Sequence, residues 1–157
     1  MSANTTPIYT LTPNIGFTKI VATSAQIKSD GTSAGSAGAD IMYKAYTAGS
    51  FGSYIEKIIF TPVSQTSQTT TPCILRVYIS TVSAPGATNG GANPDTFLLT
   101  ECAASGTITA ASTSAVSLQY EIMLNCPLAS GYYIHVSQSV AQANGNMWEA
   151  VVHGQDY

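Results

Sequence analysis

Charged side chains are scarce in this sequence. Only five basic and eight acidic residues occur among 157, so 8% of the chain is charged. An ordinary soluble domain is about 25% charged. A folded chain with so few charges must cover much of its outer face with Ser and Thr or with another subunit. We therefore expect a β-rich building block or binding module rather than a freely diffusing metabolic enzyme.

Clustered positive charge is also missing. The formal net charge is −3. Nucleic-acid binding depends on grouped Lys and Arg side chains that neutralise phosphates. The sequence therefore predicts no nucleic-acid partner, because its basic residues are scattered over positions 19, 28, 44, 57 and 76.

Cysteine pairs and long apolar runs are absent as well. Cys73, Cys102 and Cys126 form no Cys-x-x-Cys or Cys/His ligand spacing, so we expect reduced, mostly buried thiols. No stretch approaches the ~20 apolar residues of a transmembrane helix, which predicts no membrane partner. The first residues carry neither a basic region nor an apolar one of the secretory kind, so we expect synthesis in a cytoplasm.

Catalytic and metal-binding patterns are lacking too. His135 and His153 fall on the last two predicted strands and would be neighbours if those strands formed a hairpin, but no spacing supplies a third metal ligand. Carboxylates on strands are typical of sandwich-fold glycosidases, yet a single Trp gives little aromatic lining for a sugar groove. We predict no catalytic residue, no metal and no cofactor, and that the chain is not an enzyme. The strand carboxylates in question are Glu56, Glu101, Glu121 and Glu149.

Short alternating runs of apolar and polar residues fill most of the chain. Alternation with a period of two predicts half-buried β-strands, and Gly-, Ser-, Thr-, Asn- and Pro-rich stretches between them predict loops. The predicted strands are residues 17–22, 41–47, 54–63, 73–81, 96–102, 118–124, 132–137 and 147–152. The predicted loops between them include residues 30–40, 64–72, 83–95 and 103–114.

The clearest strand is residues 73–81. Its pattern places Leu75, Val77 and Ile79 on the buried face, and it places Tyr78 and Ser80 on the opposite, more tolerant face.

Eight short strands joined by loops too long for tight hairpins predict a single antiparallel two-sheet sandwich. The class is all-β, and the length suits one domain with a self-sufficient core. A jelly roll is the first choice, and an immunoglobulin-like sandwich is the alternative.

The N-terminal residues differ from the rest. We expect residues 1–16 to form an extended arm and residues 17–157 to form the sandwich, because Pro7 and Pro13 forbid a helix and interrupt a strand ladder. Two readings of the arm stay open. Its apolar side chains either lie on their own domain or dock on a neighbouring subunit. Those side chains are Ile8, Tyr9, Leu11 and Ile15.

Four short motifs carry a family resemblance. They are residues 12–16 (Thr-Pro-Asn-Ile-Gly), 52–60 (Gly-Ser-Tyr-Ile-Glu-Lys-Ile-Ile-Phe), 75–79 (Leu-Arg-Val-Tyr-Ile) and 148–157 (Trp-Glu-Ala-Val-Val-His-Gly-Gln-Asp-Tyr). The chain resembles a group of small tailed-phage and prophage virion proteins of the capsid decoration, or cement, type. In that group a Pro-x-Ile-Gly start, an Ile-Glu-Arg-Ile strand, an Arg-x-Tyr strand and a terminal Gly-Gly-Asp-Tyr or Gly-Gly-Asp-Phe recur in order. Lys57 and Gln155 depart from that pattern.

The resemblance implies a structural role on the capsid surface of a virion. The expected partners are the major capsid protein and further copies of the chain, with a trimer favoured over a dimer. The candidate interface combines the four apolar arm residues with the terminal Asp156 and Tyr157. Two alternatives remain, a carbohydrate- or receptor-binding β-module of a virion and a sandwich-fold glycosidase.

Overall fold

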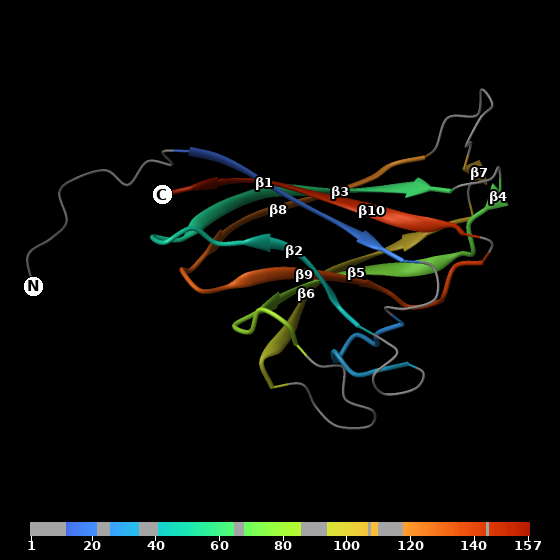
Figure 1. Cartoon of the computed structure of the whole chain (residues 1–157), viewed down its shortest axis with the longest axis horizontal. Coiled ribbons are helices and arrows are strands. Elements are labelled where there is room, and N and C mark those ends of the chain that lie inside the picture. Colours follow the sequence, from blue (N-terminus) through green and yellow to red (C-terminus); the bar gives the residue numbers. More distant parts are fainter. Residues whose placement is uncertain are drawn as a thin grey trace, which may run out of the picture.

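The structure is a computed structural model that describes residues 12–21, 26–34, 41–64, 68–85, 94–106, 108–109, 118–143 and 145–157. All regular elements in these ranges are strands (Figure 1). In chain order they are β1 (Thr12–Ile20), β2 (Tyr43–Thr47), β3 (Ser53–Val63), β4 (Gln68–Thr69), β5 (Cys73–Ser80), β6 (Thr96–Ala104), β7 (Ile108–Thr109), β8 (Tyr120–Leu128), β9 (Tyr133–Gln138) and β10 (Met147–Asp156). The part of the chain that the structure describes holds no helix long and apolar enough to span a membrane.

Two antiparallel four-stranded sheets face each other, as the upper and lower layers of Figure 1. Sheet A has the order β1-β10-β3-β8, sheet B has the order β2-β9-β5-β6, and β4 and β7 form a small separate ladder. When only the eight long strands are numbered, these orders become 1-8-3-6 and 2-7-4-5. This is the strand order of a jelly roll, in which successive strands cross between sheets. The predicted all-β sandwich of about eight strands is confirmed.

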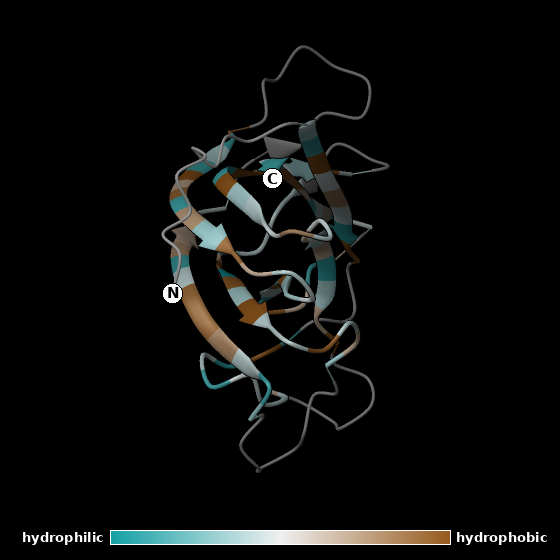
Figure 2. Ribbon diagram, turned by 90° about the vertical axis from the view of Figure 1, so that its left-hand side faces the viewer, coloured by the Kyte–Doolittle hydropathy of each residue, from teal (hydrophilic) through white to brown (hydrophobic). Residues whose placement is uncertain are grey.

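The core lies between the two sheets, where alternate side chains of facing strands meet. Trp148, Ala150 and Val152 of β10 are fully buried, as the alternation of residues 147–152 predicts. The same alternation appears as brown and teal bands along strands in Figure 2. Trp148 packs edge-on against Tyr120 of β8, with ring centres 5.7 Å apart.

Strand β5 departs from the prediction because both of its faces are buried. Leu75 and Val77 point into the core as expected, but Tyr78 and Ser80 on the other face are buried too. The outer face of sheet B is covered by the chain's own residues 26–34, so Tyr78 packs with Ile27 in a second small core. Ser80 is covered by residues 82 and 95, whose backbone its hydroxyl contacts, so the expectation that Ser80 is tolerant of substitution is wrong.

Strand β1 begins earlier than residues 17–22 suggest. Residues 12–16, which the sequence assigns to an arm, pair with β10 as the first half of β1, from Thr12 opposite Asp156 to Gly16 opposite Val152. Pro13 is accommodated because β1 is the edge strand of sheet A, where one side of the backbone needs no partner. Residues 1–11, with Ile8, Tyr9 and Leu11, lie outside the described residues.

Candidate interaction surface

Asp156 ties the two sheets together at one end of the sandwich. Its carboxylate accepts hydrogen bonds from Asn14 Nδ2 of β1 (3.0 Å), Tyr46 Oη of β2 (3.1 Å) and Ser53 Oγ of β3 (2.5 Å). Burial alone would raise the pKa of Asp156, but the hydrogen bonds from Ser53, Asn14 and Tyr46 and from the Gly49 amide outweigh it. The pKa of Asp156 is therefore lowered from its usual 3.8, and the carboxylate is held in its charged form.

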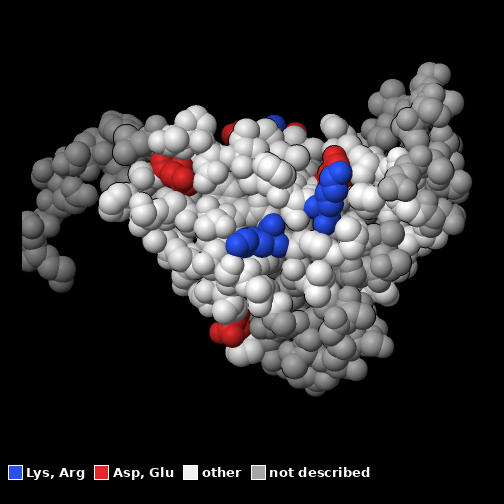
Figure 3. All heavy atoms as spheres, in the orientation of Figure 1, with Lys and Arg blue, Asp and Glu red and all other residues white. Residues whose placement is uncertain are grey.

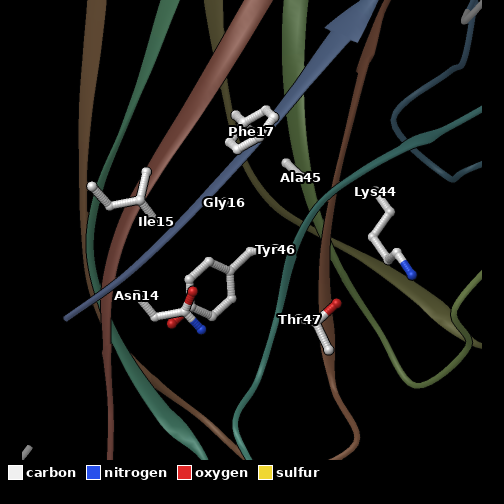
Figure 4. Close-up of a pocket in the computed structure, with 8 residues that line it drawn as sticks. All are labelled: Asn14, Ile15, Gly16, Phe17, Lys44, Ala45, Tyr46 and Thr47. Atoms are coloured by element: carbon white, nitrogen blue, oxygen red, sulfur yellow. The ribbon is translucent and has the colours of Figure 1, made fainter. Parts of the chain in front are cut away.

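Two glycines make room for this arrangement. The Tyr46 ring reaches from β2 to lie beside Asn14 at a groove of about 300 Å³ between β1 and β2 (Figure 4). A Cβ atom on Gly16 would fall 2.0 Å from the Ala45 carbonyl oxygen, and one on Gly154 would fall 2.7 Å from Tyr46 Oη. The first and last recurring motifs of the sequence thus meet here, where they position the two sheets. Strand β10 passes through Gln155 without a tight turn.

We expect Asp156→Asn to lower the free energy of unfolding by about 2 kcal/mol, because one amide oxygen replaces a carboxylate on which three donors converge. For a chain of this length that loss is about 4 to 8 °C in Tm. The measurement is thermal melting followed by circular dichroism. Asp95→Asn is the matched control, since Asp95 is exposed. An unchanged Tm in Asp156→Asn would show that the three side-chain hydrogen bonds make no net contribution to the free energy of unfolding.

The outer face of sheet B is occupied by the chain itself. Arg76 Nη1 donates to the Ile27 carbonyl and Tyr78 Oη donates to the Lys28 carbonyl, both at 2.7 Å. His135 lies under residues 81–85, with Nε2 3.1 Å from the Val82 carbonyl oxygen. Burial lowers the pKa of His135 to about 4; the Val82 carbonyl opposes that shift and the positive charge of Lys44 adds to it. Strands β5 and β9 are therefore covered on this side of sheet B, whereas Phe97, Leu98 and Leu99 of its edge strand β6 are exposed.

The outer face of sheet A, by contrast, carries exposed apolar side chains. Phe17 is 77% exposed, Ile15 58% and Met123 53%. Phe17 pairs with Val151 of β10, which pairs with Ile59 of β3, so three apolar residues lie side by side across three strands. We call Ile15, Phe17, Ile59, Met123 and Val151 the outer apolar patch. Isolated exposed apolar residues are ordinary, but a contiguous group on one sheet face marks an interaction surface.

Two ion pairs border the outer apolar patch. Lys19 Nζ lies 2.9 Å from Glu149 Oε1, and Lys57 Nζ lies 3.3 Å from Glu121 Oε2. Each lysine is thus neutralised by a carboxylate on the adjacent strand. Charged atoms are sparse on the described surface in Figure 3 as well. Recognition at this face therefore rests on apolar contact and shape rather than on a field of one sign.

A hollow of about 470 Å³ lies within this face, between β1 and β10. The cross-strand pairs Phe17–Val151 and Lys19–Glu149 form its walls, and Ala150 lies among its lining residues. The sequence did not indicate this hollow. Phe17 was assigned to an ordinary half-buried strand, and its register with Val151 follows only from the pairing of the first strand with the last.

The predicted interface residues are not brought together at one place. Ile15 lies exposed on the outer apolar patch, whereas Asp156 is held by the hydrogen bonds described above and Tyr157 follows it, half-buried. The Tyr157 amide donates to the Gly52 carbonyl. These observations give Asp156 a role within its own domain, and the other three residues lie in the segment that is not described.

The histidines and glutamates considered for chemistry are dispersed. His135 lies in sheet B and His153 in sheet A, so β9 and β10 form no hairpin and the two rings do not meet. Glu101 pairs with Arg76 on sheet B (3.0 Å), while Glu121 and Glu149 pair with lysines on sheet A. Within the described ranges, no three His, Cys, Asp or Glu side chains are grouped to hold a metal ion.

Comparisons with known proteins return little. No protein-family model matches the chain, and no curated protein matches it. Among solved structures, a chain in the structure of infectious bursal disease virus, Gx strain, matches with a TM-score of 0.32 and 11% sequence identity. The match covers 94% of this chain and 33% of that one, so the present chain spans about a third of its length. A TM-score this low supports neither the fold nor a function, and the fold rests on the strand order described above.

Proposed function

We propose that the chain is a structural protein of a virion, a capsid decoration protein that binds the outer surface of the shell as a homo-oligomer and stabilises it without catalysis. The observation that carries this proposal is the difference between the two sheet faces. In sheet B the chain's own residues 26–34 cover β5, and the exposed apolar residues are confined to the edge strand β6, while in sheet A the outer apolar patch extends over all four strands.

The sequence supports the same role. The motifs that resemble phage decoration proteins include residues 12–16 and 148–157, which form the first half of β1 and most of β10. These two strands carry Ile15, Phe17 and Val151 of the outer apolar patch. A decoration protein acts by burying surface between shell subunits, and an apolar sheet face whose lysines are paired with carboxylates suits such burial.

The direct test is co-sedimentation of the purified chain with empty capsid shells from the phage that encodes it. We expect saturable binding and a higher temperature of shell disruption in the presence of the protein. Binding to a glycan array without any binding to shells would overturn the proposal and favour a carbohydrate- or receptor-binding module.

We expect the double variant Ile15→Ser, Met123→Ser to bind shells at least about tenfold more weakly. Burial of each of these side chains contributes up to about 1.5 to 3 kcal/mol, and about 1.4 kcal/mol is a factor of ten in affinity. The matched control is Phe51→Ser, Phe97→Ser, since Phe51 is 83% exposed and Phe97 63% exposed, both away from the patch. Equal shell binding by the two double variants would show that the outer apolar patch is not the interface.

A further inference from the structure

The hollow between β1 and β10 has the character of a receptor for an apolar segment. The rings and methyl groups of Phe17 and Val151 line one end, and the mutually neutralised Lys19–Glu149 pair closes the other. A volume of about 470 Å³ accommodates two or three side chains of ordinary size. Its occupant should be uncharged and largely apolar, with at most a hydroxyl to meet the ion pair.

The chain itself contains such a segment. Residues 1–11 carry no charged side chain, and Ile8, Tyr9 and Leu11 bring three large apolar groups within four positions. The segment ends where β1 begins, because Thr12 is paired with Asp156 at the edge of sheet A.

Distance keeps the large apolar side chains of this segment from filling the hollow of their own domain. Thr18, which lines the hollow, lies six residues along β1 from Thr12, which is about 20 Å at the usual rise of a strand. Ile8 and Tyr9 lie four and three residues before Thr12, and fully extended they reach at most about 14 Å and about 11 Å from it. Even with a side chain that adds about 4 Å for Ile8 or about 6 Å for Tyr9, either residue would stop short of Thr18 if the chain turned straight back at Thr12, and Leu11 would stop closer still to Thr12.

We propose that residues 7–11 of one copy lie in the β1–β10 hollow of a second copy, with their apolar side chains against Phe17 and Val151 and the Tyr9 hydroxyl toward the Lys19–Glu149 pair. Each copy then donates one arm and accepts another. Such a head-to-tail contact closes into a ring when the rotation between copies permits, and three copies give the favoured trimer.

This proposal rests on the proposed function only in taking the chain to be a homo-oligomer. It is tested without shells, so its outcome is separate from that of co-sedimentation. If the chain binds shells but does not exchange arms, the proposed decoration role stands and the arm exchange is overturned. If the chain exchanges arms but does not bind shells, the decoration role is overturned and the arm exchange stands.

The experiment uses two complementary variants. One lacks residues 2–11 and so has a hollow but no arm, and all described strands begin after the deletion. The other is full-length Phe17→Asp, which has an arm but a charged, truncated hollow wall. We expect the parent chain to have an oligomer mass in light scattering at micromolar concentration and each variant alone to have its own monomer mass, which for the full chain is 16.3 kDa. An equimolar mixture of the two should give a heterodimer whose mass is the sum of the two monomer masses.

Three results would overturn the proposal: a monomeric parent, an unchanged oligomer mass for either variant alone, or a mixture that stays monomeric. Full-length Phe51→Asp is the control and should keep the parent mass. Circular dichroism melting verifies that both variants are folded, and full-length Phe17→Ser replaces Phe17→Asp in the mixture if the latter has lost its melting transition.

Discussion

Replacing Val77 with Asp should leave the chain unfolded at 25 °C. Val77 is fully buried in the centre of β5, between Val136 of β9 and Thr100 of β6. An unpaired carboxylate there costs several kcal/mol through lost solvation, in addition to the apolar contacts that the valine made. A domain of this kind has a total stability of about 5 to 15 kcal/mol, so most or all of it would be lost.

The measurement is far-ultraviolet circular dichroism with a thermal melt, compared with Val140→Asp. Val140 is 40% exposed, so the same substitution there leaves the new carboxylate hydrated and should change the free energy of unfolding little. Val77→Ala supplies an intermediate, with an expected loss of about 2 kcal/mol. A Val77→Asp chain that melts together with Val140→Asp would mean that β5 does not lie in the core.

Ser80 shows where alternation within a strand misleads. It has the parity opposite to Val77, which predicts solvent exposure, yet it is buried and its Oγ lies 2.8 Å from the Asp95 carbonyl oxygen and 3.1 Å from the Val82 amide. Alternation with a period of two indicates which side chains of a strand are buried between the two sheets. It does not report whether another part of the chain covers the outer face, because that cover comes from loop residues outside the strand, here Val82 and Asp95.

The eight strands and the all-β sandwich class were predictable because each strand has a local pattern of its own, whereas the choice of a jelly roll over an immunoglobulin-like sandwich rests on the strand order. Pairing of β1 with β10 was not, since it joins residues more than 100 positions apart and leaves no trace in the spacing of either segment. The outer apolar patch depends on that pairing. A row such as Phe17, Val151 and Ile59 becomes visible only when the strand order is known.

The bonds around Asp156 illustrate the same limit. Asn14, Tyr46 and Ser53 come from three different strands, and no fixed spacing relates them to Asp156. The recurring terminal motif pointed to Asp156 as an important residue, and the structure supplies the physical reason. Together with Gly16 and Gly154, this carboxylate holds the edge of sheet A against sheet B.

His135 makes stability depend on pH in a defined range. The ring is fully buried in β9 and faces Lys44 of β2 and Tyr78 of β5 across the strand ladders. Its Nε2–H donates to the Val82 carbonyl, and no described group lies within hydrogen-bonding distance of Nδ1. Protonation would place a buried positive charge near Lys44 and a buried N–H without an acceptor, so the native state holds the neutral ring.

We therefore expect the free energy of unfolding to fall by about 3 kcal/mol between pH 6.5 and pH 4. Burial lowers the pKa of His135 to about 4 in the native state, against the ordinary value of 6.5 in the unfolded chain. Above pH 6.5 both states are neutral and stability is complete. As pH falls through this range only the unfolded chain takes up the proton, which favours unfolding by up to about 1.4 kcal/mol per pH unit. Below pH 4 both states are protonated and this contribution to the slope ends.

The test is urea unfolding at pH 7.5, 6.5, 5.5 and 4.5, a range that stays above the ordinary aspartate pKa of 3.8 and above the lowered pKa of Asp156. His135→Gln retains a donor toward the Val82 carbonyl but does not titrate, so its stability should be nearly flat over these four values. His153→Gln is the matched control, because His153 is half-buried on the opposite sheet and its replacement should leave the parent slope intact. A parent slope that survives in His135→Gln, or disappears in His153→Gln, would assign the acid sensitivity to a group other than His135. The expected pattern would instead assign the acid sensitivity to His135, which lies beneath residues 81–85 in sheet B. Protonation would then destabilise the sheet opposite the one that carries the outer apolar patch.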